Sequence, residues 1–183
     1  MTENNAAITL KPLISQVEIK QRVRELAKEI SRDYAGANRD LVVVGILKGA
    51  WIFLADLVRE LTVPAKIDFM TVSSYGASTK SLGVVKIILD LKCSIAGKDV
   101  LVVEDIIDTG LTLKYIIENL SLRHPRSLKL CVLLDKPARR QVKIEPDYRG
   151  FVVPDCFVVG YGVDFAERFR HLPYIGYIEE IKE

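Results

Sequence analysis

Three carboxylates and three small residues stand close together near the middle of the chain: Glu104, Asp105, Asp108, Thr109, Gly110 and Thr112. The hydroxyl and backbone N–H groups of such a loop can bind an anion, and its glycine lets the backbone approach a ligand closely. Carboxylates beside a phosphate would repel it unless they bind sugar hydroxyls or a divalent cation. A phosphorylated sugar with free 2′ and 3′ hydroxyls, together with magnesium, satisfies both conditions. The alternative is an ordinary turn with solvated acids and a threonine cap.

The elements on either side of these residues predict how they are positioned. The β-branched run at residues 100–103 is typical of a buried strand. Apolar residues at helical spacing follow the loop: Leu113, Ile116, Ile117 and Leu120. We therefore expect a strand, an acidic turn, a threonine–glycine loop and a helix, in that order. Helix N-termini bind anions, and open α/β sheets bind ligands at the carboxyl ends of their strands, so this order favours a phosphate site.

Three further strand-like runs end in residues that can bind ligands. Residues 41–47 end at Lys48 and Gly49, ahead of a strongly apolar helix at 51–61, and this turn can hold a second anion. Residues 128–134 lead to Lys136, which is either a plain surface lysine or a donor to a ligand carbonyl oxygen. The third run ends at Gly160. If the sheet is parallel, these turns and the acidic turn converge on one edge.

The remaining elements include a first helix that reads as scaffold. Ser15 and Glu18 form a capping box, which predicts a helix from there to near Gly36. Residues 66–72 and 84–89 read as strands around a polar loop, which is either a plain hairpin loop or a mobile lid. Residues 1–13 show no periodic pattern. Residues 173–183 alternate in polarity and are expected to form an edge strand.

Composition limits the class of protein. A chain of 183 residues that is 49% hydrophobic can bury the core of one soluble domain, and a net charge of +2 is too small to argue for nucleic-acid or membrane binding. The cysteines form no C-x-x-C pair, so we expect reduced thiols. The N-terminus lacks a signal-peptide pattern, and no apolar run approaches the roughly 20 residues of a membrane span. We therefore expect a cytoplasmic protein with no nucleic-acid or membrane partner.

The stretch V-E-D-I-I-D-T-G-L-T at residues 103–112 resembles the 5-phosphoribosyl pyrophosphate loop of the phosphoribosyltransferases. Its E-D-I-I-D-T-G form is similar in particular to that of the hypoxanthine-guanine members, and the resemblance extends over residues 41–170. It implies the type I phosphoribosyltransferase fold: an α/β domain with a mainly parallel twisted sheet flanked by helices, and a small hood built from the chain termini. We expect a single domain over residues 1–183, with its core roughly at 15–160 and its hood roughly at 1–14 and 161–183.

The resemblance also implies an activity in purine salvage. Such enzymes transfer 5-phosphoribose from 5-phosphoribosyl pyrophosphate to hypoxanthine or guanine, giving IMP or GMP and pyrophosphate, with Mg²⁺ as cofactor. The residues implied to bind the donor are Glu104, Asp105, Ile106, Ile107, Asp108, Thr109, Gly110, Leu111 and Thr112. Asp108 is implied to be the general acid/base at the purine N7. Neighbouring acids would raise its pKa and bound magnesium would lower it.

Other site residues follow from the same resemblance. Lys48, Gly49 and Arg170 are expected at the pyrophosphate, with a cis peptide between Leu47 and Lys48. At the purine, Lys136 is expected to read the 6-oxo group, Phe157 to stack, and Val158 to bind through its backbone, with Asp164 beside them. Glu104, Asp105 and Asp164 are the expected magnesium ligands, and Ser74 and Tyr75 the lid.

The chain departs from some relatives at two places. Leu111 stands where others have lysine, which removes one phosphate contact but keeps the backbone amide. The residues 161–163 border the base and differ among relatives, so selectivity among hypoxanthine, guanine and xanthine stays open. A xanthine- or guanine-preferring enzyme is the nearest rival. A regulatory nucleotide- and RNA-binding member of the fold would need a basic surface, and a dinucleotide-binding protein would need G-x-G-x-x-G; the sequence has neither. The helix at 51–61 is apolar nearly all round, which suggests a subunit interface and a homo-oligomer, either dimer or tetramer.

Overall fold

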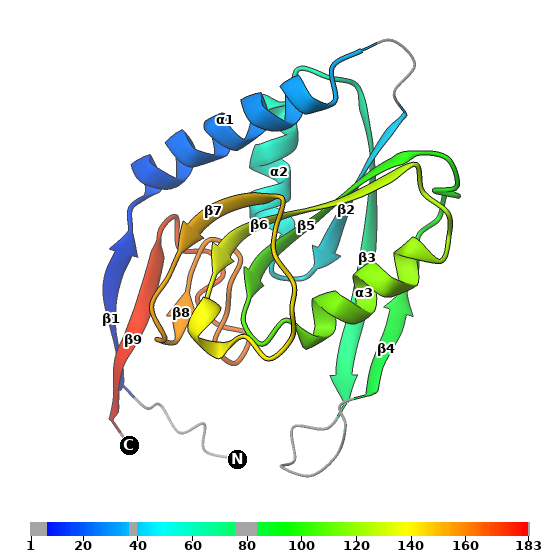
Figure 1. Ribbon diagram of the computed structural model, residues 1–183. Helices are drawn as coiled ribbons and strands as arrows, with labels where there is room; N and C mark the ends of the chain where they lie inside the picture. The colour runs from blue at the N-terminus through cyan, green and yellow to red at the C-terminus, as the bar shows by residue number, and fades with distance from the viewer. Residues whose placement is uncertain (1–6, 37–39, 76–83, 183) are drawn as a thin grey trace.

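The computed structural model describes residues 7–36, 40–75 and 84–182 (Figure 1). Among these residues, the main sheet has six strands in the order β4-β3-β2-β5-β6-β7: β4 Val84–Leu89, β3 Ala65–Tyr75, β2 Leu41–Leu47, β5 Asp99–Ile107, β6 Ser127–Asp135 and β7 Tyr148–Val152. All neighbours pair in parallel except β3 and β4. A second sheet has the order β1-β9-β8, formed by β1 Ala7–Ile14, β9 Ile175–Lys182 and β8 Val158–Val159. The expected α/β fold with a mainly parallel sheet and a hood from the termini is confirmed.

Helices cover both faces of the main sheet because its central strands are apolar on both sides. Alternate residues of β2 separate into two buried clusters: Val43 packs with α1 (Gln16–Asp33) and α2 (Trp51–Glu60), and Val42 packs with α3 (Leu111–Ser121). Figure 1 shows α1 and α2 together on one side and α3 on the other. The polar loops at the strand ends are thereby held by a core on each face.

The structure contains the elements that local sequence patterns predict. The strands expected at 41–47 and 84–89 have those bounds. The helix α1 begins after Ser15, whose side chain accepts from the backbone N–H of Glu18 at 3.3 Å, while Glu18 accepts from the backbone N–H of Ser15 at 2.8 Å. The capping box is therefore confirmed.

Three expectations about elements are wrong. Glu104 and Asp105 lie inside β5 rather than in a turn, because β5 stays paired with β6 as far as Ile107. The strand that leads to Gly160 belongs to the second sheet, so only three of the four expected turns share the edge of the main sheet. The C-terminal strand β9 is central in its sheet, because β1 and β8 pair with it on either side. Residues 7–14, which show no periodic pattern but belong to the expected hood, form β1 of the second sheet.

Within one chain α2 is buried on a single side. Its buried residues are Phe53, Leu54 and Leu57, whereas Trp51 is 50% exposed. The expectation that this helix is buried on more than one side therefore fails for the single chain. Among the described residues, no helix is long and apolar enough to cross a membrane.

Candidate active site

The loop between β5 and α3 forms a small cavity at the N-terminus of that helix. Gly110 is the residue that precedes α3, and its φ of +82° is a left-handed conformation that favours glycine. A β-carbon there would also lie 2.8 Å from Ile144 Cγ2. The cavity measures about 160 Å³ and is lined by Glu104, Ile106, Ile107, Asp108, Thr109, Gly110, Thr112 and Leu113. Unpaired N–H groups at a helix N-terminus attract anions, so the geometry suits a phosphate.

Two partly buried acids, Glu104 and Asp105, lie at the end of β5, and Arg170 is the cation that acts on Asp105. Burial raises the pKa of the Asp105 carboxyl to about 6, against the opposing effects of the Ile106 N–H that it accepts at 2.9 Å and of the nearby Arg170 guanidinium. Burial and the Asp105 charge raise the pKa of Glu104 well above its usual range. The Oε2 atom of Glu104 is buried without a hydrogen-bond partner among the described residues. A buried oxygen without a partner is costly, so these acids fit an external donor or cation.

The turn after β2 packs directly onto these acids. The peptide bond between Leu47 and Lys48 is cis, as expected. A β-carbon at Gly49 would lie 1.7 Å from Asp105 Oδ2, so any larger residue would displace the Asp105 carboxylate. Lys48 Nζ donates to Glu167 Oε2 at 2.9 Å, which links this turn to the loop after Gly160. The predicted pyrophosphate residues therefore lie beside the acids.

The loop after Gly160 brings Asp164 and Arg170 to the same place. Arg170 Nη2 lies 2.8 Å from Asp164 Oδ1, and Arg170 Nη1 donates to the carbonyl oxygen of Gly162 at 2.8 Å. The charges of both residues influence the Asp105 carboxyl. A cation and two carboxylates thus lie together next to the Lys48 turn.

A second cavity, of about 410 Å³, adjoins the first. It is lined by Asp105, Ile106, Asp108, Lys136, Arg139, Asp155, Cys156, Phe157, Val158, Val163 and Asp164. The side chain of Lys136 is buried, and its Nζ donates to the carbonyl oxygen of Cys156 at 2.7 Å, which leaves it two more donors. The ring of Phe157 is 53% exposed and rests edge-on against Phe165 at 5.2 Å. A buried donor and an open aromatic face suit a flat ligand with a carbonyl oxygen.

Asp108 and Ile106 line both cavities. The side chain of Asp108 is 40% exposed, and its Oδ1 lies 3.4 Å from Arg139 Nε, an ion-pair distance. Sequence reasoning named Asp108 but gave no role to Arg139, which occurs in a short basic turn that resembles any solvated surface. It also missed Glu167, because the partnership with Lys48 joins segments far apart in the chain.

The three expected magnesium ligands are not gathered into one cluster. Among the described residues, no group of three or more His, Cys, Asp or Glu side chains is arranged to hold a metal ion. Glu104 lines the first cavity, whereas Asp105 and Asp164 line the second. Magnesium is usually bound by one or two carboxylates together with substrate phosphates and water, so the pair Asp105 and Asp164 fits it without a preformed cage.

The expected lid falls mostly outside the described residues. Ser74 and Tyr75 are the last residues of β3, and neither their side chains nor residues 76–83 are described. The assignment of these residues to a lid stays a prediction.

The comparisons with known proteins agree on one family. The profile of the phosphoribosyl transferase domain matches residues 13–166. A hypoxanthine phosphoribosyltransferase of Escherichia coli strain K12 is 52% identical over 168 residues, 92% of this chain and 94% of that protein. A hypoxanthine-guanine phosphoribosyltransferase of Dictyostelium discoideum is 48% identical over 171 residues, 92% of this chain and 94% of that protein.

Solved structures give the same result. The crystal structure of a hypoxanthine phosphoribosyltransferase from Staphylococcus aureus superposes with a TM-score of 0.88 at 48% identity, covering 92% of this chain and 91% of that one. A hypoxanthine-guanine phosphoribosyltransferase from Bacillus anthracis gives a TM-score of 0.87 at 45% identity, covering 93% and 99%. Similarity of this extent, together with the paired cavities around Asp108, shows that the chain belongs to the phosphoribosyl transferase family.

Proposed function

We propose that this chain transfers the 5-phosphoribosyl group of 5-phosphoribosyl pyrophosphate to N9 of hypoxanthine or guanine, releasing pyrophosphate and forming IMP or GMP. The observation that carries this proposal is the pair of cavities that meet at Asp108. A sugar phosphate suits the cavity at the helix N-terminus, and an oxopurine suits the cavity that holds Lys136 and Phe157. The sugar C1 then lies where the two cavities join, next to the Asp108 carboxylate. The names of the relatives support hypoxanthine as a substrate.

The donor occupies the three strand ends. Its 5-phosphate binds the 108–112 loop, whose backbone N–H groups and threonine hydroxyls are the donors. Its ribose hydroxyls donate to Glu104 and Asp105, which gives the buried Glu104 Oε2 the partner that the described residues do not supply. Its pyrophosphate binds at Lys48, Gly49 and Arg170. This division gives the acids hydroxyl donors as partners, between the two phosphate positions.

Magnesium fits the acids beside the pyrophosphate position. Asp105 and Asp164 would hold it, with Glu104 as a third proposed ligand. When bound, magnesium neutralises charge on the pyrophosphate leaving group. The chain's own contribution is to keep two carboxylates buried or half-buried at that point, with Arg170 2.8 Å from Asp164 to limit their repulsion.

The acceptor base binds in the larger cavity. Lys136 Nζ donates to the 6-oxo oxygen while it keeps its bond to the Cys156 carbonyl. Phe157 stacks on the purine, and the backbone of Val158 contacts its edge. Asp164 borders the base. An exocyclic amine at position 6 would present N–H groups to the Lys136 ammonium, so adenine is disfavoured.

The reaction is a displacement at the sugar C1. The purine N9 attacks C1 as the C1–oxygen bond to pyrophosphate breaks, through an oxocarbenium-like state. Asp108 accepts or holds the proton at the purine N7 as N9 bonds to the sugar, so that the base is not left with a positive charge. Ser74 and Tyr75 belong to the proposed lid, which would exclude water that could hydrolyse the donor.

One assay tests the proposal directly. The purified chain is incubated with magnesium, 5-phosphoribosyl pyrophosphate and each of hypoxanthine, guanine, xanthine, adenine and uracil, and pyrophosphate release is measured. We expect turnover with hypoxanthine and guanine and none with adenine or uracil. Release with xanthine alone would move the chain to the xanthine-preferring class. No release with any base would refute the proposal.

The cysteines and the exposed apolar residues also support proposals about the cellular compartment and the oligomeric state. We propose a cytoplasmic enzyme, since the described cysteines Cys93, Cys131 and Cys156 are all free thiols and suit a reducing compartment. We also propose a homo-oligomer, because Trp51 on α2 and Ile67 and Phe69 on β3 expose apolar side chains.

A further inference from the structure

The segment that follows β6 runs along the outer side of the 108–112 loop. We call residues 136–144 the strap; it begins with Lys136 and the short 3₁₀ helix Pro137–Arg139. Three consecutive carbonyl oxygens at the start of the loop accept hydrogen bonds from it. Lys136 N donates to Ile107 O at 3.0 Å, Arg140 Nε to Asp108 O at 3.3 Å, and Gln141 N to Thr109 O at 2.9 Å. The strap therefore fixes three successive peptide groups.

These bonds determine which way the loop amides point. In a planar trans peptide the N–H group points opposite to the carbonyl oxygen of the preceding residue. Since the carbonyl oxygens of Ile107, Asp108 and Thr109 face the strap, the N–H groups of Asp108, Thr109 and Gly110 point away from it. The strap thus orients the donors on which an anion site in this loop depends.

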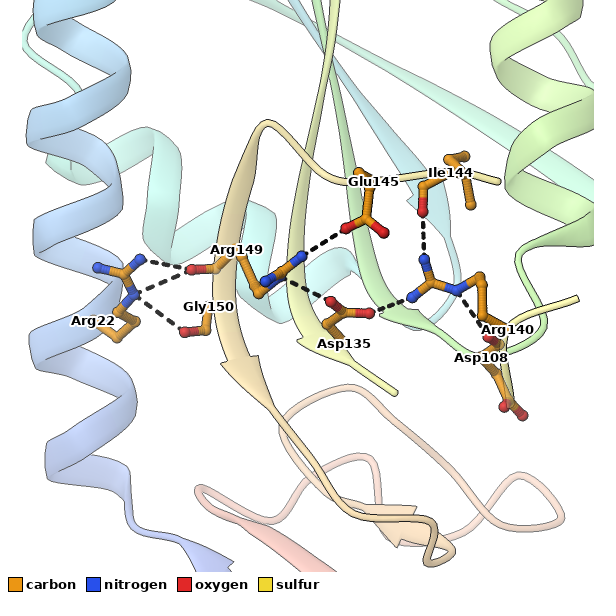
Figure 2. Close-up of polar contacts among 8 residues, drawn as sticks. All are labelled: Arg22, Asp108, Asp135, Arg140, Ile144, Glu145, Arg149 and Gly150. Atoms are coloured by element: carbon orange, nitrogen blue, oxygen red, sulfur yellow. Dashed lines mark hydrogen bonds and ion pairs between the residues drawn. The ribbon is translucent and has the colours of Figure 1, made fainter. Parts of the chain in front are cut away.

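Among these three bonds only that of Arg140 comes from a side chain, and each nitrogen of its guanidinium group donates a hydrogen bond. Besides the bond to Asp108 O, its Nη1 donates to Ile144 O and its Nη2 to Asp135 Oδ1 (Figure 2). Its side chain is 13% exposed and that of Asp135 is 2% exposed. A guanidinium fork bonded in three directions has a single orientation, so it can fix the position of the carbonyl that it bonds.

The buried Asp135 carboxylate is shared with a second arginine. Arg149 Nε lies 2.8 Å from Asp135 Oδ2, and Arg149 Nη2 bonds Glu145 Oε2 at 2.8 Å. Arg149 approaches Asp135 from β7, on the side away from the loop, and none of its contacts in Figure 2 reaches Asp108. The two arginines therefore share one partner, but only Arg140 bonds the loop.

We infer that Arg140 is a positioning residue for phosphate binding: its bond to the Asp108 carbonyl holds the 108–112 loop in the conformation that receives the 5-phosphate of the donor. This inference rests on the proposed function. Without the guanidinium the Asp108 carbonyl loses its partner, so the ligand must order the peptide between Asp108 and Thr109, and that cost weakens binding. The effect is specific to ligands that occupy the loop.

The test compares Arg140→Met with the matched variant Arg149→Met. Each removes one cationic partner of Asp135, but only the first removes a bond to the loop. Dissociation constants are measured by calorimetry with magnesium for 5-phosphoribosyl pyrophosphate, and for pyrophosphate alone, which does not need the loop. We expect Arg140→Met to weaken donor binding about tenfold, the order expected for one charged hydrogen bond, with pyrophosphate binding unchanged. We expect Arg149→Met to change neither.

The outcomes separate this inference from general damage. Wild-type donor affinity in Arg140→Met would overturn it, and so would equal losses for the donor and for pyrophosphate, or equal losses in the two variants. If Arg140→Met does not fold, Arg140→Lys takes its place, since a lysine keeps a cation beside Asp135 but cannot bond Asp108, Ile144 and Asp135 together. Normal donor affinity in that variant would overturn the inference too. Failure of the wild-type protein to bind the donor would refute the proposed function instead.

Discussion

Asp108 differs from the other acids of the site because it lines both cavities and its side chain is partly open to solvent. It can therefore reach a proton on the base while its backbone belongs to the phosphate-binding loop. Asp108→Asn keeps the size of the side chain and the loop backbone but removes the proton acceptor. We expect kcat to fall by about 10²–10⁴-fold, the usual contribution of a general acid/base, with much smaller loss of donor affinity. Steady-state kinetics and calorimetry measure the two effects, and an unchanged kcat would remove Asp108 from this role.

Lys136 is a buried cation with one carbonyl partner and two remaining donors. If those donors read the 6-oxo group, Lys136→Ala should abolish the preference for hypoxanthine over adenine. Sites that bond a polar substrate group discriminate strongly, so we expect the ratio of kcat/KM values to fall by about 10²-fold or more. The control is Lys143→Ala, which removes an exposed lysine from the strap without touching either cavity. Discrimination retained in the Lys136 variant would disprove the assignment.

At the scale of elements, the sequence predicts the helices and strands that depend on interactions between nearby residues. The capping box at Ser15 and the apolar run of β2 each act within a few residues, and both appear as expected. The apolar run at residues 100–103 predicts a turn at Glu104 and Asp105, yet pairing with β6 carries the strand through them. The strand β1 contains Pro12 and pairs with β9 at the other end of the chain, so no local pattern marks it.

The site, like the elements, could be predicted only where neighbouring residues in the sequence determine it. Residues that can bind a ligand, such as Lys48 and Lys136, could be predicted from the sequence because they follow apolar runs, and parallel strands end at one edge of the sheet. The side chains and carbonyl groups that these residues contact could not be predicted. Glu167 meets Lys48 and Arg140 meets the Asp108 carbonyl across gaps in sequence that only the folded chain closes.

The junction between β3 and the segment after β4 depends on one buried carboxylate. Asp68 accepts the backbone N–H groups of Lys92 at 2.9 Å, of Cys93 at 3.3 Å and of Phe69 at 2.9 Å. Burial alone would raise the pKa of Asp68, but these hydrogen bonds outweigh it and lower the pKa. A carboxyl whose pKa is lower in the folded state stabilises the fold above its unfolded pKa and loses that effect as the pH falls through the folded pKa.

Asp68→Asn should therefore destabilise the protein in a pH-dependent way. At pH 7 we expect a loss of about 1–3 kcal/mol in the free energy of unfolding. The reason is that an asparagine amide has one acceptor oxygen, whereas the carboxylate accepts hydrogen bonds with both of its oxygens. The loss should shrink as the pH falls below about 4, the unfolded value, because the unfolded chain then takes up a proton that the folded carboxyl binds only at lower pH. Urea unfolding across this range measures it. Asp40→Asn, at a surface ion pair with Lys66, is the control and should change stability little. A loss independent of pH would contradict the argument.

At the scale of the whole molecule, one face of the main sheet is incompletely covered. Ile67 and Phe69 pair with Val43 and Gly45 of β2, and Val43 points toward α1 and α2. Side chains of paired residues share a face, so Ile67 and Phe69 point the same way. The helices on that face contact β2, β5 and β7. Beyond them Ile67 and Phe69 remain 42% and 37% exposed, and Trp51 at the start of α2 is 50% exposed.

This apolar surface predicts an oligomer that a single charge can disrupt. Phe69→Glu would place a carboxylate in the contact, where burying an unpaired charge is costly. We expect the wild-type protein to be a dimer or tetramer by light scattering after gel filtration, and Phe69→Glu to be a monomer at the same concentration. Val17→Glu is the matched control, because Val17 is 78% exposed on α1 and outside this surface. A wild-type monomer, or the same loss of mass in both variants, would show that a second copy does not cover β3.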